Sequence, residues 1–472
     1  MIISSLQTIC KPIFGQFDRE EFKKFLRMGL TFTFVIGSYW TLRVLKGSIF
    51  HSLVNNDNLP WAKTVSLILL VPIVIGYTKL LDKYARDRVF YLLSAGYALA
   101  TVTFALLMLS PIGQAAPEII AARTGLAFWG TQILGYAWYV FVESYGSLLV
   151  ALFWAIASDT TMPDSAKKGF SLVVAIGQLG GIVGPSLIAS LPHEMGKRYA
   201  HSFLETDALS IGLTALTILG SILCLRGFFS NTPKELLVSF HGKNEKEEEK
   251  EQEPGFLEGL KLLVRHKYLL CIFAVLSFFE IIVTIFDFHF QILAKQHYTG
   301  VALSSYLGSY GSYVNIVALV CLLLGVSNIT RILGVGIALV MMPIIYAGAI
   351  WGFISFESLN FLFWLMVSSK AINYALNGPA VKQLYLPTTH DVRFKSQAWI
   401  ETFGSRGSKE AGSIFNMTLK PLQSKFGVIA GRAYHVMASA YLGAALIVCW
   451  IFVALYLGRT FKKATDEKRV IC

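Results

Sequence analysis

The sequence has 472 residues, of which 54% are hydrophobic and only 15% are charged. Soluble globular proteins carry about 25% charged residues, so this composition and a mean hydropathy of +0.57 exclude a typical soluble protein and indicate a polytopic membrane protein. The 41 Lys and Arg residues exceed the 29 Asp and Glu residues, which gives a net charge of +12. Basic cytoplasmic loops account for much of such an excess, so it does not indicate a nucleic-acid-binding protein.

The N-terminal segment, residues 1–27, is expected to be cytoplasmic and not a cleaved signal. From residue 11 it mixes basic and acidic side chains, and it lacks a short apolar core followed by small residues. A plastid transit peptide would be poor in acidic residues, so this start is typical of a bacterial protein.

Twelve apolar stretches of about 20 residues follow, each long enough to cross a bilayer as a helix. They lie near residues 28–50, 60–81, 89–110, 129–157, 168–191, 207–228, 268–293, 303–325, 332–355, 357–379, 396–418 and 433–458. The pattern predicts an all-α polytopic membrane protein with twelve transmembrane helices in two six-helix halves, similar to the major facilitator class. In the fifth stretch, Gly180 and Gly184 before Pro185 favour close helix packing.

The break after the sixth stretch contains a charged run at 243–251 that is too polar to pack against a core. The chain is therefore expected to divide into five parts. After the N-terminal segment come an N-terminal half at 28–228, a cytoplasmic linker at 229–267, a C-terminal half at 268–458 and a cytoplasmic tail at 459–472.

Basic residues are distributed unevenly between the connections. They gather in the N-terminal segment, in the second-to-third and fourth-to-fifth connections and in the tail, whereas residues 51–59 contain none and residues 111–128 contain only Arg123. The positive-inside rule therefore places both termini and the central linker in the cytoplasm. For a bacterial chain, the expected location is the inner membrane.

Two cations inside the first apolar stretch are the first indication of a substrate. Arg43 and Lys46 are three residues apart and share one face of a helix, and each costs about 2.5–3.5 kcal/mol at the centre of a membrane helix. Lys46 could instead extend to the outer interface, because polar Asn55 is near in the sequence. Glu143, in the fourth stretch, must be protonated or paired, and a pair with Arg43 or Lys46 is expected. Such a pair could hold helices together and could also act as a gate when an anionic substrate competes for the cation.

The seventh stretch carries acidic residues at membrane depth. Glu280 and Asp287 are seven residues apart and so lie on one face of a helix, and His289 follows them. Carboxyl groups inside a bilayer are the usual proton carriers of symporters, which makes Glu280 and Asp287 candidates for proton coupling. His289 is expected to be an interfacial or hydrogen-bonded residue and not a proton relay.

A second group of cations runs along the tenth and eleventh stretches. It comprises Lys370, Lys382, Arg393, Lys395, Arg406 and Lys409. Arg406 and Lys409 repeat the three-residue spacing of the first-helix pair, whereas Lys382 could be a binding residue or an ordinary cytoplasmic charge. Two cationic pairs facing a central cavity would neutralise several phosphate charges, with Arg offering bidentate contacts and Lys compact point charges.

Aromatic residues lie beside these charges, and one or two of them could stack on a nucleobase, whereas most are expected to pack between helices or at the membrane interface. They are Tyr39, Trp40, Trp138, Tyr139, Tyr145, Trp154, Tyr306, Tyr310 and Tyr313. The sequence shows no nucleophile–base constellation, no phosphate-binding loop and no Cys/His cluster among its six cysteines. An enzyme, a metal site and a bound cofactor are therefore not expected.

Several motifs, in order along nearly the whole chain, carry a family resemblance. Tyr39 to Lys46 resembles the first-helix motif W-x-L-R-x-x-K-D of the ATP/ADP translocase family of obligate intracellular bacteria and plastids. Trp138 to Lys168 resembles the family's FYVxAELWGSVV…LFW…N…EAKRFY segment. Val381 to Pro387 resembles KEMAYIPL, and Lys395 to Lys409 resembles KGKAAID…GSRLGKSGG.

This resemblance implies that Lys46, Glu143, Glu280 and Lys409 match the charged positions that the family uses for nucleotide transport, with Lys382 as a further candidate. The chain departs from the family where Gly47 replaces the acid after the first-helix lysine and where Gln383 replaces the acid after Lys382. In addition, the segment from Glu280 to Thr284 stands where the family has EVTWK, so a lysine is missing there. Strict exchange of ATP for ADP is accordingly the family's implied activity and not a deduction from these residues.

The sequence thus predicts a membrane transporter of nucleotides that works by alternating access, with exchange of host ATP for ADP implied by the resemblance. Arg43, Lys46, Arg406 and Lys409 would hold phosphates, and the two glutamates would pair with these cations between substrates. A proton-coupled nucleotide symporter and a major-facilitator carrier of another organic phosphate are the alternatives. The expected partners are the nucleotide and the lipid bilayer, without nucleic acid, and the chain is expected to act as a monomer.

Overall fold

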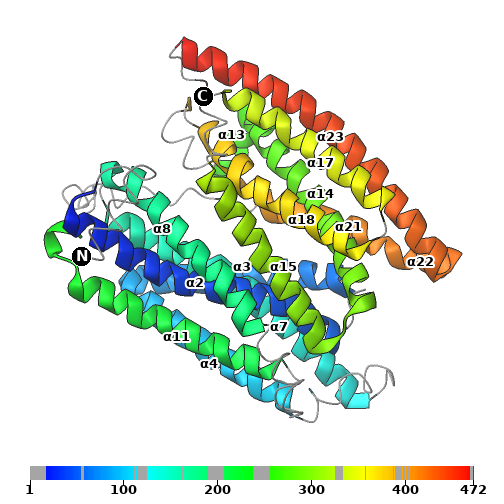
Figure 1. Ribbon diagram of the computed structural model, residues 1–472, viewed down its shortest axis with the longest axis horizontal. Helices are drawn as coiled ribbons and strands as arrows, with labels where there is room; N and C mark the ends of the chain where they lie inside the picture. Colours follow the sequence, from blue (N-terminus) through cyan, green and yellow to red (C-terminus); the bar gives the residue numbers. More distant parts are fainter. Residues whose placement is uncertain are drawn as a thin grey trace. The chain divides into compact units, whose positions relative to one another are not determined.

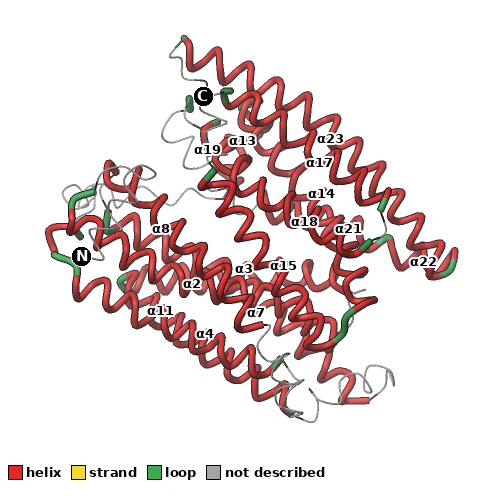
Figure 2. The backbone as a smooth tube through the Cα atoms, in the orientation of Figure 1, coloured by secondary structure: helices red, strands yellow, loops and turns green. Residues whose placement is uncertain are grey.

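The computed structural model of the chain consists of helices joined by loops, without a strand among the residues that it describes (Figures 1 and 2). These residues are 17–54, 58–110, 113, 125–161, 163–189, 207–237, 256–324, 333–356, 358–385, 387–388, 396, 399–400, 404–467 and 471. The charged run at 243–251, most of the N-terminal segment and Lys395 lie outside them. The chain divides into two compact units, one formed by Met1–Glu249 with His297–Ile316 and the other by Lys250–Gln296 with Val317–Cys472.

The first unit is built around α2, a helix of 35 residues. Its elements are α2 (Arg19–Leu53), α3 (Leu59–Lys83), α4 (Arg86–Leu109), α7 (Gly125–Asp159), α8 (Pro163–Val183), the π-helix η2 (Gly184–Ala189), α11 (Ala208–Asn231) and the 3₁₀ turn η3 (Lys234–Leu236). α2 packs against α7, α8 and α11, and α11 lies alongside α4 (Figure 1). Glu20 and Glu21 in the first turn of α2 favour its start electrostatically.

Glycines allow α8 and η2 to approach α2 closely, as the sequence predicts. A Cβ atom on Gly180 would overlap the backbone oxygen of Thr33, and one on Gly184 would lie 2.6 Å from the backbone oxygen of Gly37. Small residues at such crossings let helix backbones touch without a side chain between them. The face of α2 that carries Thr33 and Gly37 is therefore the face that packs against α8 and η2.

The second unit is built around α14. Its elements are α13 (Phe256–Arg265), α14 (Lys267–His297), α15 (Gly300–Leu323, which begins in the first unit), α17 (Val335–Ser355), α18 (Leu359–Ile372), the π-helix η6 (Asn373–Asn377), α19 (Gly378–Gln383), α21 (Ser405–Met417), α22 (Leu419–Phe426) and α23 (Val428–Asp466). α17 lies alongside α23 (Figure 2). Asn416 of α21 donates to the backbone oxygen of Thr284 at 3.2 Å and so joins α21 to α14.

Seven helices in the described part of the chain are long and apolar enough to cross a membrane. They are α3, α4, α7, α11, α14, α17 and α23. The other five predicted spans correspond to α2, α8 with η2, α15, α18 with η6, and α21, which are not among these seven. The helical fold class is therefore confirmed, whereas the count of twelve transmembrane helices stays a prediction. Because charged side chains are costly in lipid, α2 with Arg43 and Lys46 and α21 with Arg406 and Lys409 are expected to turn these residues toward protein or water.

The predicted linker contains secondary structure that the sequence reading did not anticipate. η3 follows α11, and the ten-residue helix α13 precedes α14. Residues 238–255 between them lie outside the described part.

Candidate functional site

Lys46 and Glu143 form an ion pair inside the first unit. The Lys46 Nζ atom donates a hydrogen bond to Oε1 of Glu143 and lies 4.5 Å from the ring centre of Tyr139. Lys46 comes from the last third of α2 and Glu143 from the middle of α7. The two side chains are 17% and 35% exposed, so the pair is enclosed by helices but still accessible. The ion pair predicted for Glu143 is therefore present, with Lys46 as a partner.

Arg43 lies on the same face of α2, one turn before Lys46, against two aromatic rings. Its Nη1 atom donates to the hydroxyl of Tyr39 at 2.8 Å, and its guanidinium carbon lies 5.2 Å from the ring centre of Trp40. A cation over an aromatic face gains about 0.5–2 kcal/mol, depending on how far it is desolvated. These contacts stabilise the charged guanidinium group at membrane depth.

Most of the other candidate aromatic residues pack between helices. Trp138, Tyr139 and Tyr145 are fully buried within the first unit, whereas Tyr313 is 41% exposed. Among the candidates for base stacking, Tyr39 and Trp40 contact Arg43, and Tyr139 contacts Lys46.

Glu280 of α14 faces α21 in the second unit. Its Oε1 atom accepts a hydrogen bond from Ser405 Oγ at 2.9 Å and lies 3.4 Å from Lys409 Nζ. Glu280 is 16% exposed and Lys409 is 51% exposed, so the carboxylate is held inside while the ammonium group extends outward. Ser405 was not predicted as a site residue, although its position four residues before Lys409 places both on one helix face.

Two further predicted cations belong to neighbouring elements of the second unit. Arg406 is half-buried on α21, three residues before Lys409. Lys382 lies in α19, and its side chain is outside the described part of the structure.

Asp287 forms an ion pair that the sequence reading did not include in the site. Lys370 Nζ of α18 donates to Asp287 Oδ1 at 2.6 Å, and Gln291 Nε2 donates to Oδ2 at 2.9 Å. The sequence identified both ionisable residues but could not pair them, because 83 positions separate them. Glu280 and Asp287, which share a face of α14, therefore contact two different helices.

His289 is buried and hydrogen-bonded, in line with its structural interpretation. Its Nε2 atom lies 2.9 Å from Ser439 Oγ and 3.2 Å from His435 Nδ1, and both partners come from α23. The pair of imidazoles joins α14 to α23 within the second unit.

Lysine–carboxylate pairs between apolar helices, in the part of the chain that the structure describes, are typical of a polytopic membrane transporter, and the fold is of the major facilitator type. A bacterial homologue of the iron transporter ferroportin in an inward-facing state has a TM-score of 0.59 at 12% identity, with 92% of this chain and 98% of that chain covered. A bacterial homologue of the human drug peptide transporters PepT1 and PepT2 has a TM-score of 0.57 at 15% identity, covering 94% and 99%. The chain belongs to the TLC ATP/ADP transporter family, whose model matches residues 4–461.

Curated relatives agree with this assignment over almost the entire sequence. ADP,ATP carrier protein 1 of Rickettsia bellii is 25% identical over 498 aligned residues, which cover 98% of this chain and 97% of the relative. The chloroplastic ADP,ATP carrier protein 1 of Arabidopsis thaliana is 23% identical, covering 99% of this chain and 78% of the relative. The resemblance drawn from the motifs is therefore confirmed, and the chain is a transporter of nucleotides and not an enzyme.

Proposed function

We propose that this protein exchanges ATP for ADP by alternating access across a bacterial inner membrane and thereby imports host nucleotide. It has both termini in the cytoplasm and works as a monomer. The relatives' description as ADP,ATP carriers and the family match support the exchange of these two nucleotides. The positive-inside distribution of Lys and Arg supports the orientation.

One observation carries the mechanism: each unit contains a lysine held by a glutamate from another helix. Lys46 pairs with Glu143 in the first unit, and Lys409 pairs with Glu280 in the second. A nucleotide phosphate competes with the carboxylate for the same ammonium group, because both offer anionic oxygens. Arg43 and Arg406 lie one turn from these lysines and add bidentate phosphate contacts, and Lys382 is a further candidate.

The same pairs account for obligatory exchange. In the empty carrier each pair joins two helices of its unit, and separating those helices leaves both charges without their partner in a partly desolvated position. Phosphate supplies a replacement anion for the lysine, so the loaded carrier can separate those helices more easily than the empty one. A ligand shifts a conformational equilibrium only through such differential interaction with its two states.

The test is transport by the purified protein in liposomes, with and without ADP inside. We expect labelled ATP to enter when ADP is present inside, to enter slowly without it, and to be unaffected by an uncoupler. Uptake that collapses with the uncoupler would instead favour proton coupling through Glu280 or Asp287. GTP, UTP, CTP, NAD and a sugar phosphate, added as unlabelled competitors, define the substrate class, and a lack of any nucleotide uptake would overturn the proposal.

Substitutions in the two lysine–glutamate pairs assign the site within the same assay. Lys46→Ala and Lys409→Ala should each raise the concentration of ATP needed for half-maximal uptake at least tenfold, because a phosphate loses its cation. Lys463→Ala on α23 is a matched control, since that lysine is 72% exposed and pairs with Glu467, the residue that caps the C-terminus of the same helix. Unchanged ATP affinity in both site variants would remove these lysines from the binding site.

A further inference from the structure

The ion pair between Lys370 and Asp287 occupies the same place in its half of the chain as Lys46–Glu143 does in the other half. Within the predicted spans, Lys46 is residue 19 of the first and Asp287 is residue 20 of the seventh. Glu143 is residue 15 of the fourth span and Lys370 is residue 14 of the tenth. Each pair therefore joins the late part of the first helix of a half to the middle of its fourth helix.

The charges of the two pairs are reversed. The first helix supplies the ammonium group in one half and the carboxylate in the other. The halves of major-facilitator proteins are parallel repeats related by an axis along the membrane normal, so equivalent residues lie at equivalent depth. The two ion pairs lie at the same depth and join equivalent helices, which favours a common role. Because the charges are reversed, the two halves share an ion pair at this place and not the same residue type at each position.

The two pairs are also similar in accessibility. The side chains of Lys370 and Asp287 are 10% and 24% exposed, compared with 17% and 35% for Lys46 and Glu143. In both cases the lysine is the more enclosed partner and the carboxylate is the more accessible one. Neither pair is sealed in a core, so a soluble anion can approach either of them.

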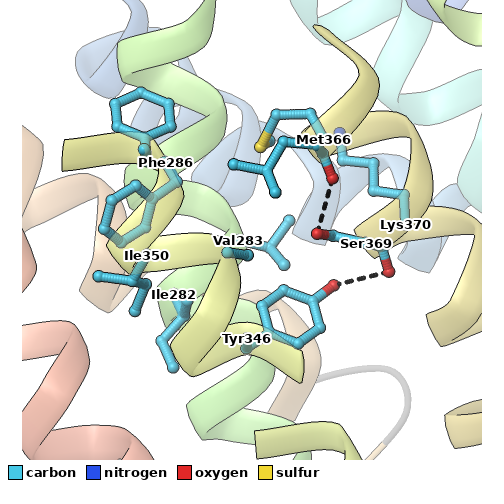
Figure 3. Close-up of a pocket in the computed structure, with 11 residues that line it drawn as sticks. Ile282, Val283, Phe286, Tyr346, Ile350, Met366, Ser369 and Lys370 are labelled. Carbon is cyan, nitrogen blue, oxygen red and sulfur yellow. Dashed lines mark hydrogen bonds between the residues drawn. The ribbon is translucent and has the colours of Figure 1, made fainter. Parts of the chain in front are cut away.

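The surroundings of Lys370 make its partner important. On one side is a pocket lined almost entirely by apolar side chains, among them Phe286, Tyr346 and Met366, and its polar rim includes Ser369 (Figure 3). Tyr346 donates its hydroxyl to the backbone oxygen of Ser369, the residue before Lys370, at 3.1 Å. Apolar side chains stabilise an ammonium charge poorly, so separating Lys370 from Asp287 is costly unless another anion takes the place of Asp287.

The helix that carries Lys370 changes its geometry at this point. The α-helix α18 becomes the π-helix η6 three residues later, and the backbone N–H of Asn373 bonds to the carbonyl oxygens of both Ser369 and Lys370. π-helical turns inside α-helices occur frequently at functional sites. Asp287, in contrast, is fixed on its regular helix by Gln291, which donates to its second oxygen.

We propose that Lys370 is a further phosphate-binding residue of this transporter and that Asp287 is its resting partner in the empty carrier. Lys370–Asp287 is thus a second coupling pair, the charge-reversed counterpart of Lys46–Glu143. Phosphate takes the ammonium group of Lys370, the contact between α14 and α18 is released, and the loaded carrier changes conformation. This inference rests on the proposed exchange of nucleotides and assigns to it two residues with one joint function.

The experiment measures ATP uptake into liposomes with and without internal ADP for three variants. Asp287→Asn leaves Lys370 without its carboxylate, so we expect tighter ATP binding and at least a tenfold smaller ratio of uptake with ADP to uptake without it. Lys370→Met removes the phosphate contact, and we expect at least a tenfold loss of ATP affinity. The double exchange Asp287→Lys with Lys370→Asp restores the pair and should restore the dependence on ADP, but not the affinity.

Controls separate this role from a purely structural one. Glu467→Gln removes an exposed ion pair of α23 and should leave both quantities unchanged. If Lys370–Asp287 only holds the fold together, the single variants lose thermal stability while the ADP dependence and ATP affinity of the folded protein stay as in wild type, and this result overturns the proposal.

Two further outcomes are decisive. Should Asp287→Asn fail to fold, Gln291→Leu loosens Asp287 without leaving a charge exposed, and an unchanged ADP dependence in that variant contradicts the inference. Wild-type protein that exchanges no nucleotide refutes the proposed function itself, whereas normal wild-type exchange with unaltered variants refutes only the role of this pair.

Discussion

At the scale of single residues, Lys24 shows how a buried cation can join helix ends outside the membrane-spanning part. Its side chain is buried near the start of α2, and Nζ donates to the backbone oxygens of Thr160 at 2.5 Å and Leu236 at 2.8 Å. Thr160 directly follows the end of α7 and Leu236 is the last residue of η3, and carbonyl groups at helix ends lack intrahelical partners and carry partial negative charge. Burial lowers the pKa of Lys24 from 10.5 to about 8, although the negative charge of Glu21 opposes the shift.

This pKa predicts a pH dependence of stability. Between pH 8 and pH 10.5 the unfolded chain holds the lysine proton and the folded chain does not, so the free energy of unfolding rises with pH, by up to about 1.4 kcal/mol per pH unit. In Lys24→Met this contribution is lost. The melting temperature of wild type minus that of Lys24→Met should therefore increase when detergent-solubilised samples are taken from pH 7.5 to pH 10. A difference that stays constant would mean that Lys24 keeps its proton in the folded state.

The sequence predicted those residues of the site whose charged side chains interrupt an apolar stretch. Glu143 was expected to need a cation, and the structure provides Lys46. The Lys370–Asp287 pair and the hydroxyl of Ser405 were not foreseen, because a single sequence carries no information on which of several distant helices a side chain meets. A short hydroxyl is also unremarkable in a membrane helix, whereas a charge is not.

At the scale of elements, the crossing of α8 over α2 depends on the absence of a side chain at Gly180. A Cβ atom there would overlap the backbone of Thr33, whose hydroxyl donates across the crossing to the backbone oxygen of Ile176 at 3.0 Å. Gly180→Ala should therefore lower the melting temperature of the purified protein, because overpacking costs about 1–3 kcal/mol.

Gly212→Ala is the matched control for this crossing. Gly212 lies in α11 of the same unit, and a Cβ atom there would meet nothing within 4 Å. Since alanine is favoured over glycine in helices by about 1 kcal/mol, the control should be as stable as wild type or slightly more so. Equal destabilisation by both substitutions would contradict the role assigned to the crossing.

The apolar stretches of the sequence predicted where the long helices lie better than they predicted the π-helical segments and the short helix. The seven strongly apolar stretches are found as long helices, because a continuous apolar run of this length has few other stable forms. The two π-helical segments, η2 from Gly184 and η6 just beyond Lys370, were not predicted. The short helix α13 also escaped notice, because the charged composition around it is typical of a solvated linker.

At the scale of the whole molecule, composition and order alone indicated the fold class, and shared motifs indicated the family. Both follow from features that survive divergence to about 25% identity: the spacing of apolar stretches and a few charges that are expensive to keep in a membrane. The substrate did not follow from physical arguments, since paired cations suit any organic phosphate. Only the resemblance to a family narrowed the anion to a nucleotide.

The orientation of the chain is the remaining global property that the sequence predicts, and single cysteines can test it. In a variant whose six native cysteines are replaced by serine and which still exchanges nucleotides, Gln114→Cys lies in the nearly uncharged connection after the third predicted span, and Asn244→Cys lies in the charged linker. The excess of Lys and Arg on alternate connections places the linker inside, because positive loops are retained in the cytoplasm.

A membrane-impermeant maleimide should therefore label Gln114→Cys in intact cells and Asn244→Cys only after the cells are lysed. Labelling of both positions before lysis would indicate leaky cells and is checked with a cytoplasmic marker protein. The reverse labelling pattern would show that the protein has the opposite orientation in the membrane. An odd number of spans in the second half would leave both results unchanged but move the C-terminal tail outside, so a third cysteine at Thr465, near the end of α23, completes the test and should be labelled only after lysis.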